Sequence, residues 1–359
     1  SYGITLAGLD IGWATRGLFV GQAPVTGSPA GSQIRHLVLR DSVIHDIDSL
    51  SIFTWTGSGD GWVRPGISDF LVVRNEFARI GFRDNEQGAV GLSFHRADHL
   101  LFEGNWVHDI AHNGVHFSQA QTQSSRRYDV PAEDILTGDV LVRGNLFERC
   151  VQNATDAGGL KFWGAVGDDT DSFRDVLVTR NISRNNVGWA WVSEQRDNWT
   201  YHGKAGMGYY IDYAGGITFF RNIAYANGLA GFMASGSWYD QPVVMANNTF
   251  ADSPDGFDLG IRAALSDANT GFFAVNNIFV HLQRFAVAVG LHSVHGHALF
   301  APQLGGLAAL AIGQADDLDP PSARGVEGDS ASSTPHEVCG MGAHHERGFL
   351  RVGHVFPLV

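Results

Sequence analysis

Short runs that begin with glycine carry side chains capable of acid–base chemistry at every second position. Three of them set an imidazole, an ammonium group, and a phenol with a carboxylate between apolar residues: Gly114-Val115-His116-Phe117, Gly159-Leu160-Lys161-Phe162 and Gly208-Tyr209-Tyr210-Ile211-Asp212. Period two is the geometry of a β-strand, whose successive side chains point to opposite faces. If the apolar residues face a core, the reactive side chains share the outer face.

Other runs of the same kind extend this outward set. Stacked in order, they predict one continuous stripe of polar and aromatic side chains, with these further members: Ser93, His95, Ser118, Trp163, Met233, Ser235 and Asp258. The stripe is therefore the predicted site, with His116, Tyr210, Trp163, His95 and Asp258 as candidate substrate-binding residues.

Carboxylates on or near the stripe suggest hydrolysis of a glycosidic bond. Asp212 with Glu194 or Asp156 could act as acid and as base or nucleophile, and their separation would decide between retention and inversion. Structural explanations stand beside this one: Asp212 and Glu194 as solvated surface charges, and Asp156 as a turn residue that caps the backbone before Gly158.

A rival set is Lys161, His116 and Tyr210. A β-eliminating lyase needs a base for the proton next to a uronate carboxylate and a cation to neutralise that carboxylate, and these side-chain types could supply both. Alternatively, Lys161 only holds substrate hydroxyls beside the carboxylates.

An asparagine repeat indicates how these strands are positioned. The ladder position is occupied by Ser42, Asn75, Asn105, Asn145, Asn181, Asn222, Asn248 and Asn277, at intervals of 33, 30, 40, 36, 41, 26 and 29 residues. The residues five and three before it are apolar in every repeat, and six of the eight residues two after it are large and apolar. This predicts strand, corner, strand, with the Asn in the left-handed region at the corner and its amide bonded to its own backbone or to the next amide of the ladder.

With the glycine-started run as a third strand, each repeat is one coil of a parallel β-helix. The chain lacks the long stretches of period 3.6 that a helical solenoid needs, and a β-propeller would need four strands per repeat. We expect an all-β, right-handed parallel β-helix of three strands per coil and about 8–10 coils over residues 1–290, followed by an irregular cap or tail over 291–359.

The longest ladder intervals are consecutive, from Asn105 to Asn222, so their extra residues are expected in loops beside the stripe. They span 119–137, 165–173 and 188–206, and the last holds Glu194, Trp199 and His202. Aromatic loops that wall a groove suit an extended glycan, so Trp199 and His202 join the candidate substrate-binding residues.

We predict no metal site and no cofactor. His108, His112 and His116 have a spacing that aligns ligands only on a helix, whereas this segment is expected to cross a strand, a turn and a strand. His45 and His108 share one outward repeat position, so stacking explains them better. Calcium would need an acidic cluster such as Asp168, Asp169 and Asp171, and such a run is more often a solvated loop. Cys150 occupies a core position that Ile47, Ile80 and Ile110 fill in earlier repeats.

Composition limits the partners. A net charge of −13 argues against nucleic acid, although a local basic patch could still meet a polyanionic substrate. No apolar stretch is long enough to span a membrane, and a monomer is expected.

Several sequence segments resemble the repeats of secreted bacterial right-handed parallel β-helix proteins, the pectate-lyase-like superfamily of polysaccharide lyases and glycoside hydrolases. They include Glu103-Gly104-Asn105-Trp106-Val107-His108-Asp109-Ile110 and Asp156-Ala157-Gly158-Gly159-Leu160-Lys161-Phe162. The resemblance implies a polysaccharide-degrading enzyme that is extracellular or periplasmic. A glycoside hydrolase is the leading hypothesis, a polysaccharide lyase or uronan epimerase the alternative, and a non-catalytic glycan-binding β-helix the third.

Overall fold

The computed structural model describes residues 3–21, 34–55, 67–82, 90–95, 97–118, 138–154, 157–164, 173–188, 206–212, 214–234, 242–253, 255–259, 272–281, 285–289 and 308–310. Within these ranges every regular element is a strand. None of these residues belongs to a helix that is long and apolar enough to cross a membrane. The chain divides into two compact units, 1–312 and 313–359, and every described strand belongs to the first.

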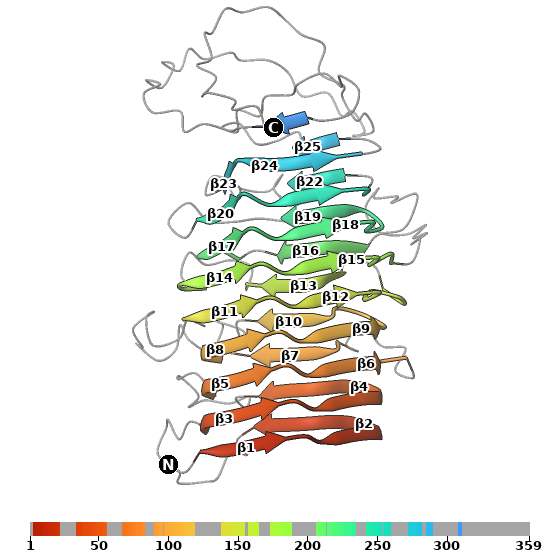
Figure 1. The fold of residues 1–359 in the computed structure, drawn as a ribbon, viewed down its shortest axis with the longest axis vertical. Coiled ribbons are helices and arrows are strands. Elements are labelled where there is room, and N and C mark those ends of the chain that lie inside the picture. The colour runs from red at the N-terminus through yellow and green to blue at the C-terminus, as the bar shows by residue number, and fades with distance from the viewer. Residues whose placement is uncertain are drawn as a thin grey trace, which may run out of the picture. The chain divides into compact units, whose positions relative to one another are not determined.

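The first side of the solenoid is a nine-stranded sheet in which every neighbouring pair of strands is parallel (Figure 1). Its strands, in spatial and chain order, are β1 (Ile4–Ala7), β3 (Ile34–Arg40), β5 (Ile67–Val73), β8 (Ala97–Glu103), β11 (Val140–Arg143), β14 (Val176–Thr179), β17 (Ile217–Phe220), β20 (Val243–Ala246) and β23 (Phe272–Val275). Each strand pairs with the corresponding strand of the next repeat, which is the pairing of a parallel β-helix, as predicted.

The second side follows directly after the asparagine corner. It consists of the first part of β2 (Asp10–Gly21) and of β4 (Val43–Trp55), then β6 (Glu76–Ile80), β9 (Trp106–Ile110), β12 (Leu146–Glu148), β15 (Ile182–Arg184), β18 (Ile223–Tyr225), β21 (Thr249–Ala251) and β24 (Asn277–Val280). From β4 onward these strands also pair in parallel, coil on coil.

The third side carries the predicted site. Its strands are the second part of β2 and of β4, then β7 (Leu92–His95), β10 (Val115–Ser118), β13 (Ala157–Trp163), β16 (Gly206–Asp212), β19 (Ala230–Ala234), β22 (Asp255–Leu259) and β25 (Phe285–Val289). The strand β4 spans both sides, since it pairs with β6 near its start and with β7 near its end. A short strand β26 (Ala308–Leu310) pairs antiparallel with β24, and the rest of the expected tail lies outside the described residues.

The asparagine ladder forms as expected, by bonds from one coil to the next. The backbone N–H of Asn105 donates to Asn145 Oδ1 at 2.8 Å, and the Asn105 side-chain nitrogen donates to the same oxygen at 3.1 Å. The Asn145 amide in turn donates to the Phe102 carbonyl and to Asn181 Oδ1, both at 2.9 Å. Backbone bonds of the same kind run from Leu9, through Ser42, to Asn277.

One prediction about the corner is wrong. The residue with positive φ is the one before each ladder residue, as at Asp41 (52°), Arg74 (53°), Arg180 (56°) and Arg221 (58°), and not the asparagine itself. The asparagine stays in a conformation open to any residue because its amide bonds neighbouring coils rather than its own backbone. The left-handed conformation that makes the turn is therefore adopted by the residue before each ladder residue. Glycine occupies this preceding position at Gly104 and Gly144.

The interior is filled by side chains of alternate strand positions, with aromatic rings in files along the coils. Phe94, Phe117 and Phe162 are fully buried, and their ring centroids are 5.1 and 4.9 Å apart in succession. Cys150 is also fully buried, as expected from its repeat position. In later coils that position starts a second, shorter ladder, in which Asn186 Oδ1 accepts from the Cys150 N–H and Asn227 Oδ1 accepts from the Asn186 amide.

Replacing Asn145 by alanine should lower the free energy of unfolding by about 3 kcal/mol, because buried groups of Asn105 and Phe102 lose their partners. Urea unfolding measures the effect. The matched control is Asn153→Ala at an exposed position, where a change within about 0.5 kcal/mol is expected. Equal destabilisation by the two variants would contradict a structural role for the ladder.

Candidate active site

Strand register brings the predicted outward side chains into two adjacent columns. In the first, Ser93, His116, Lys161, Tyr210 and Met233 are successive partners across β7, β10, β13, β16 and β19. In the second, the partners are His95, Ser118, Trp163 and Asp212. Their inward neighbours, including Leu160, Phe162, Tyr209 and Ile211, are at most 1% exposed. The predicted alignment is therefore confirmed from β7 to β19 in the first column and from β7 to β16 in the second, and the role of these side chains as a site stays a prediction.

An ion pair joins the two columns. Lys161 Nζ lies 3.0 Å from Asp212 Oδ2, and the two side chains are only 9% and 8% exposed. The ammonium also lies over the Tyr210 ring, 4.3 Å from its centroid. Asp212 is therefore a buried, paired carboxylate, and the expectation of a solvated surface charge at this position is wrong.

The second oxygen of that carboxylate is unusual. Asp212 Oδ1 is buried and accepts no hydrogen bond from any group in the described part of the chain. Leaving a buried carboxylate oxygen without a donor costs free energy. A hydroxyl of a bound ligand would supply the missing donor.

His116 adjoins Lys161 in the first column, one coil earlier. Burial of the ring holds its pKa well below the ordinary value, and the charge of Lys161 lowers the pKa further. Its Nε2 atom is buried and has no hydrogen-bond partner among the described residues. The Trp163 ring is 6.2 Å away and tilted by 37°. The site thus contains a neutral imidazole next to a fixed cation.

His95, on β7, is the member of the second column nearest the N-terminal coils. Its Nδ1 lies 2.7 Å from Ser118 Oγ and its Nε2 lies 3.1 Å from Ser93 Oγ. The Phe53 ring packs edge-on against it, with centroids 5.3 Å apart. Both ring nitrogens are therefore held by hydroxyl groups, so His95 is fixed in orientation.

Several predicted site residues cannot be placed. Glu194, Asp156, Trp199 and His202 lie outside the described residues, as do nearly all of the expected loops of the long coils. Asp258 lies on β22, in register with Met233, but its side chain is outside the described set. The predicted pairing of carboxylates around Asp212 therefore stays a prediction.

Two groups near the columns were missed as site residues. One is His112, considered only as a metal ligand, which lies in the turn between β9 and β10. The other is Met207, which packs with the stripe members Tyr210 and Met233 in a small apolar cluster that also contains Leu229 and Ala230. Met207 lies two and four residues before the core residues Tyr209 and Ile211, so strict alternation assigns it to the core, and the environment of His112 depends on turn contacts that no spacing shows.

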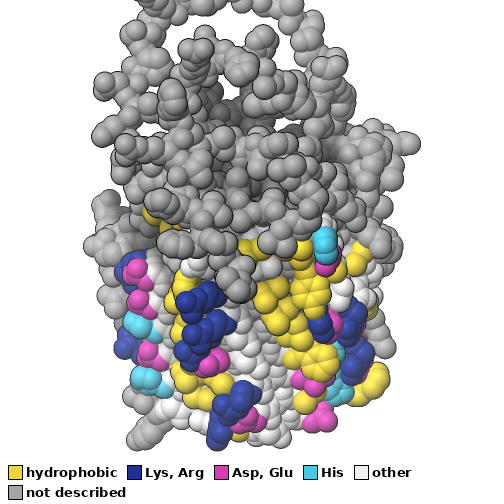
Figure 2. All heavy atoms as spheres, turned by 45° about the horizontal axis from the view of Figure 1, so that its top comes forward, with side chains coloured by type: hydrophobic (Ala, Val, Ile, Leu, Met, Phe, Trp, Pro, Cys, Tyr) yellow, Lys and Arg dark blue, Asp and Glu magenta, His cyan; other side chains and the backbone are white. Residues whose placement is uncertain are grey.

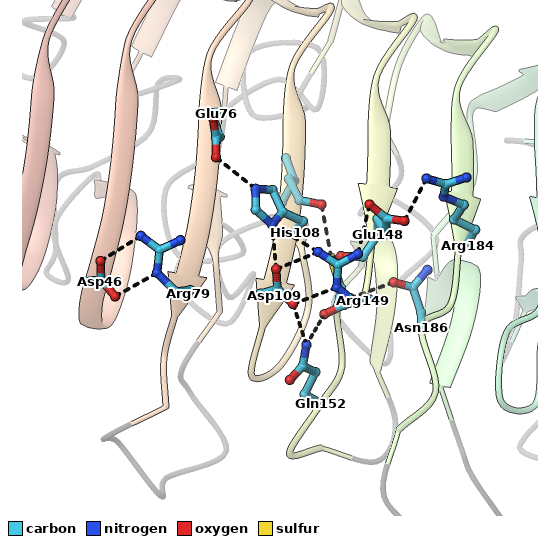
Figure 3. Close-up of polar contacts among 12 residues, drawn as sticks. Asp46, Glu76, Arg79, His108, Asp109, Glu148, Arg149, Gln152, Arg184 and Asn186 are labelled. Atoms are coloured by element: carbon cyan, nitrogen blue, oxygen red, sulfur yellow. Dashed lines mark hydrogen bonds and ion pairs between the residues drawn. The ribbon is translucent and has the colours of Figure 1, made fainter.

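Among the described residues, five further histidines contact carboxylates: His36, His45, His99, His108 and His281. His108 Nδ1 is 2.6 Å from Asp109 and its Nε2 is 3.1 Å from Glu76 (Figure 3). The Trp106 ring stacks on the His108 ring, with centroids 3.9 Å apart. His45 and His108 share one column, as predicted, but Ala78 lies between them. Figure 2 shows the basic side chains gathered in columns with acidic ones beside them.

One group of described residues consists of side chains of the kinds that bind metal ions. Ligand atoms of Asp98, His99 and Asp139 all lie within 4.8 Å of one another. The two ring nitrogens of His99, however, face different carboxylates, at 2.9 and 3.3 Å, and Arg174 lies within 3.8 Å of both acids. Contacts with His99 and Arg174 therefore explain why the carboxylates of Asp98 and Asp139 lie close together.

No protein-family model matches the chain, and no curated protein matches it by sequence. Among solved structures, a mutant of the periplasmic alginate epimerase AlgG is similar with a TM-score of 0.45 and 13% identity, over 77% of this chain and 49% of that one. The ORF18 protein of Geobacillus virus E2 is similar with a TM-score of 0.25 and 12% identity, over 77% of this chain and 54% of that one. The chain spans about half the length of each. The β-helix assignment rests on the strand pairing itself.

Removing one partner of the buried ion pair should destabilise the protein more than removing both. Lys161→Met leaves Asp212 charged and unpaired, and should lower the free energy of unfolding by about 3–5 kcal/mol. The double variant Lys161→Met with Asp212→Leu should recover much of that loss. Urea unfolding of the single and double variants measures it, and additive losses would contradict the pairing.

Proposed function

We propose that the protein removes the C5 proton of a uronic-acid unit in a polysaccharide, as a lyase or an epimerase. The observation that carries the proposal is the position of His116 beside Lys161 in the register of β10 and β13, with a buried Nε2 atom that has no hydrogen-bond partner among the described residues. A polysaccharide substrate would be met in the periplasm or outside the cell, in agreement with the expected location.

The chemistry needs a base that is unprotonated at the working pH. The C5 proton is acidic because it is alpha to a carboxylate, but its removal builds more negative charge on a group that is already anionic. His116, held neutral by burial, can accept the proton through a ring nitrogen. The positive charge of Lys161 can stabilise the substrate carboxylate as the negative charge on it grows.

The other side chains orient the sugar. Asp212 holds the Lys161 ammonium in place, and its free Oδ1 is suited to accept a sugar hydroxyl. Trp163, which is partly exposed, presents aromatic surface next to these polar groups. Burial around the ion pair lowers the local dielectric, which strengthens each of these interactions.

Elimination and epimerisation share the loss of the C5 proton and differ in the next step. In an elimination, the bond from C4 to the leaving oxygen breaks, a C4=C5 double bond forms, and the leaving oxygen takes up a proton. In an epimerisation, C5 receives a proton on its opposite face. The Tyr210 hydroxyl is the proposed proton donor in either case.

A glycoside hydrolase is the second candidate. It is favoured by Asp212 Oδ1, a buried carboxylate oxygen with no donor among the described residues. In its ion pair Asp212 suits the role of nucleophile or base, so the acid would have to be Glu194 or Asp156. Product masses separate the candidates, since each hydrolytic cut adds one water and an elimination adds none.

His116→Ala should lower kcat/KM on a polyuronate by about 100-fold or more, because the general base is lost. The assay follows ultraviolet absorbance of an unsaturated uronate for a lyase, and the NMR spectrum of the polymer for an epimerase. His36→Ala, at an exposed site on the first side, is the matched control and should keep full activity. A His116→Ala variant that retains activity would refute the role of this residue, and binding without any change in the polymer would favour a non-catalytic protein.

The pH profile provides a separate test. Since the pKa of His116 lies well below 6.5, the base stays unprotonated as the pH falls through 6.5. The acid limb of kcat/KM should therefore lie well below pH 6.5, with activity lost only as the pH falls through the lowered pKa. An acid limb at or above pH 6.5 would contradict a buried neutral base.

A further inference from the structure

His112 lies in a turn that two coils hold rigid. Its carbonyl accepts a hydrogen bond from the Val151 N–H at 2.8 Å, and the carbonyl of Ala111 accepts one from the Asn153 N–H at 2.7 Å. The turn precedes β10, which carries His116. The proposed chemistry makes no use of His112.

The neighbouring amide has a fixed orientation. The backbone N–H of Gly158 donates to Asn113 Oδ1 at 2.8 Å, and Asn113 is only 2% exposed. A backbone N–H can only donate, so the atom that it meets must be the amide oxygen. The other end of the Asn113 amide is therefore its NH2 group.

That orientation determines the protonation of His112. Asn113 Nδ2 lies 2.8 Å from His112 Nδ1, and because the amide nitrogen only donates, Nδ1 must accept. A neutral imidazole that accepts at Nδ1 carries its hydrogen on Nε2. A proton on Nδ1 would set two donors face to face. Burial and the charge of Lys161 act in the same direction and lower the pKa of His112 to about 4.

His112 also belongs to the surroundings of the proposed site. The charge of Lys161 acts on both His112 and His116, and His112 acts on His116. Gly158, which anchors Asn113, lies near the start of β13, the strand that carries Lys161. Within the part of the chain that the structure describes, no group forms a hydrogen bond with His112 Nε2.

We propose that His112 is a substrate-binding residue whose Nε2–H donates a hydrogen bond to a carboxylate or hydroxyl oxygen of the uronic-acid chain bound at Lys161. This inference rests on the proposed function. A neutral donor fits the site because a second cation beside His116 would make that imidazole a weaker base. Asn113 is the positioning residue, since its amide selects the form of His112 that can donate.

Nitrogen-15 NMR of the histidine rings tests the tautomer without any substrate. We expect protonated Nε2 and unprotonated Nδ1 at neutral pH, with titration near pH 4. Asn113→Asp puts an acceptor where the NH2 group was, so Nδ1 should become protonated while the Gly158 bond is kept. Protonated Nδ1 in the unaltered protein would overturn the inference.

Binding of a uronic-acid hexasaccharide, measured by calorimetry, tests the role. His112→Ala should raise Kd about five- to tenfold, the loss expected for one hydrogen bond, and should raise KM more than it lowers kcat. His112→Gln, which keeps a donor, should recover part of the affinity. The control His281→Ala, at an exposed corner, should bind as the unaltered protein does.

The outcomes separate this inference from the proposed function. Unchanged affinity in His112→Ala overturns the binding role, even if His116→Ala abolishes activity. Weakened binding in His112→Ala, with full activity in His116→Ala, supports the binding role and refutes the proposed base. If the unaltered protein binds no uronate, both the function and the binding role fail, and the spectra still decide the tautomer.

Discussion

The hydrogen bond from one coil's backbone to the asparagine side chain of the next is the constraint on which the other features depend. From Asn105 to Asn277 each ladder oxygen accepts two donors from the preceding coil, and from Asn75 to Asn248 each ladder NH2 group donates to a strand of the preceding coil and to the following amide. A carboxamide can satisfy this pattern only in one register. The strands that follow each corner are therefore aligned, and His116, Lys161 and Tyr210 become neighbours although tens of residues separate them.

Electrostatics at the site depend on that alignment. One coil rises by about 4.8 Å, so a cation on one strand is within reach of side chains on both neighbouring strands. Lys161 meets a carboxylate and an aromatic ring from the next coil, and a neutral imidazole adjoins it from the previous one. The cation is thus stabilised on one side, and on the other its charge adds to the effect of burial in lowering the pKa of His116. Burial strengthens both effects because it excludes the solvent that would screen them.

Much of the fold and part of the site could be predicted from residue order alone. Period-two alternation assigned Leu160 and Phe162 to the inside and Lys161 to the outside, and the ladder spacing predicted which strands pair. The bond between Lys161 and Asp212 could not be foreseen, because it crosses from one column to the other and depends on side-chain conformations. The second ladder was hidden because Ile47, Ile80 and Ile110 fill its position in earlier coils. The role of the residue before each asparagine was missed because types as different as Asp41, Arg74 and Gly104 share one backbone conformation there.

The unequal lengths of the coils have a consequence for how such a chain can change. Ladder bonds of 2.9 and 3.0 Å close intervals as different as 26 and 41 residues. Residues added between two ladder positions therefore leave the frame unaltered, so natural selection can vary the segments between the strands while the two columns of side chains are inherited intact. A mutation in the ladder, by contrast, removes bonds between neighbouring coils. The asparagine ladder is thus a constant framework, and the segments between ladder positions can vary in length, as the loops of antibodies vary on a constant framework.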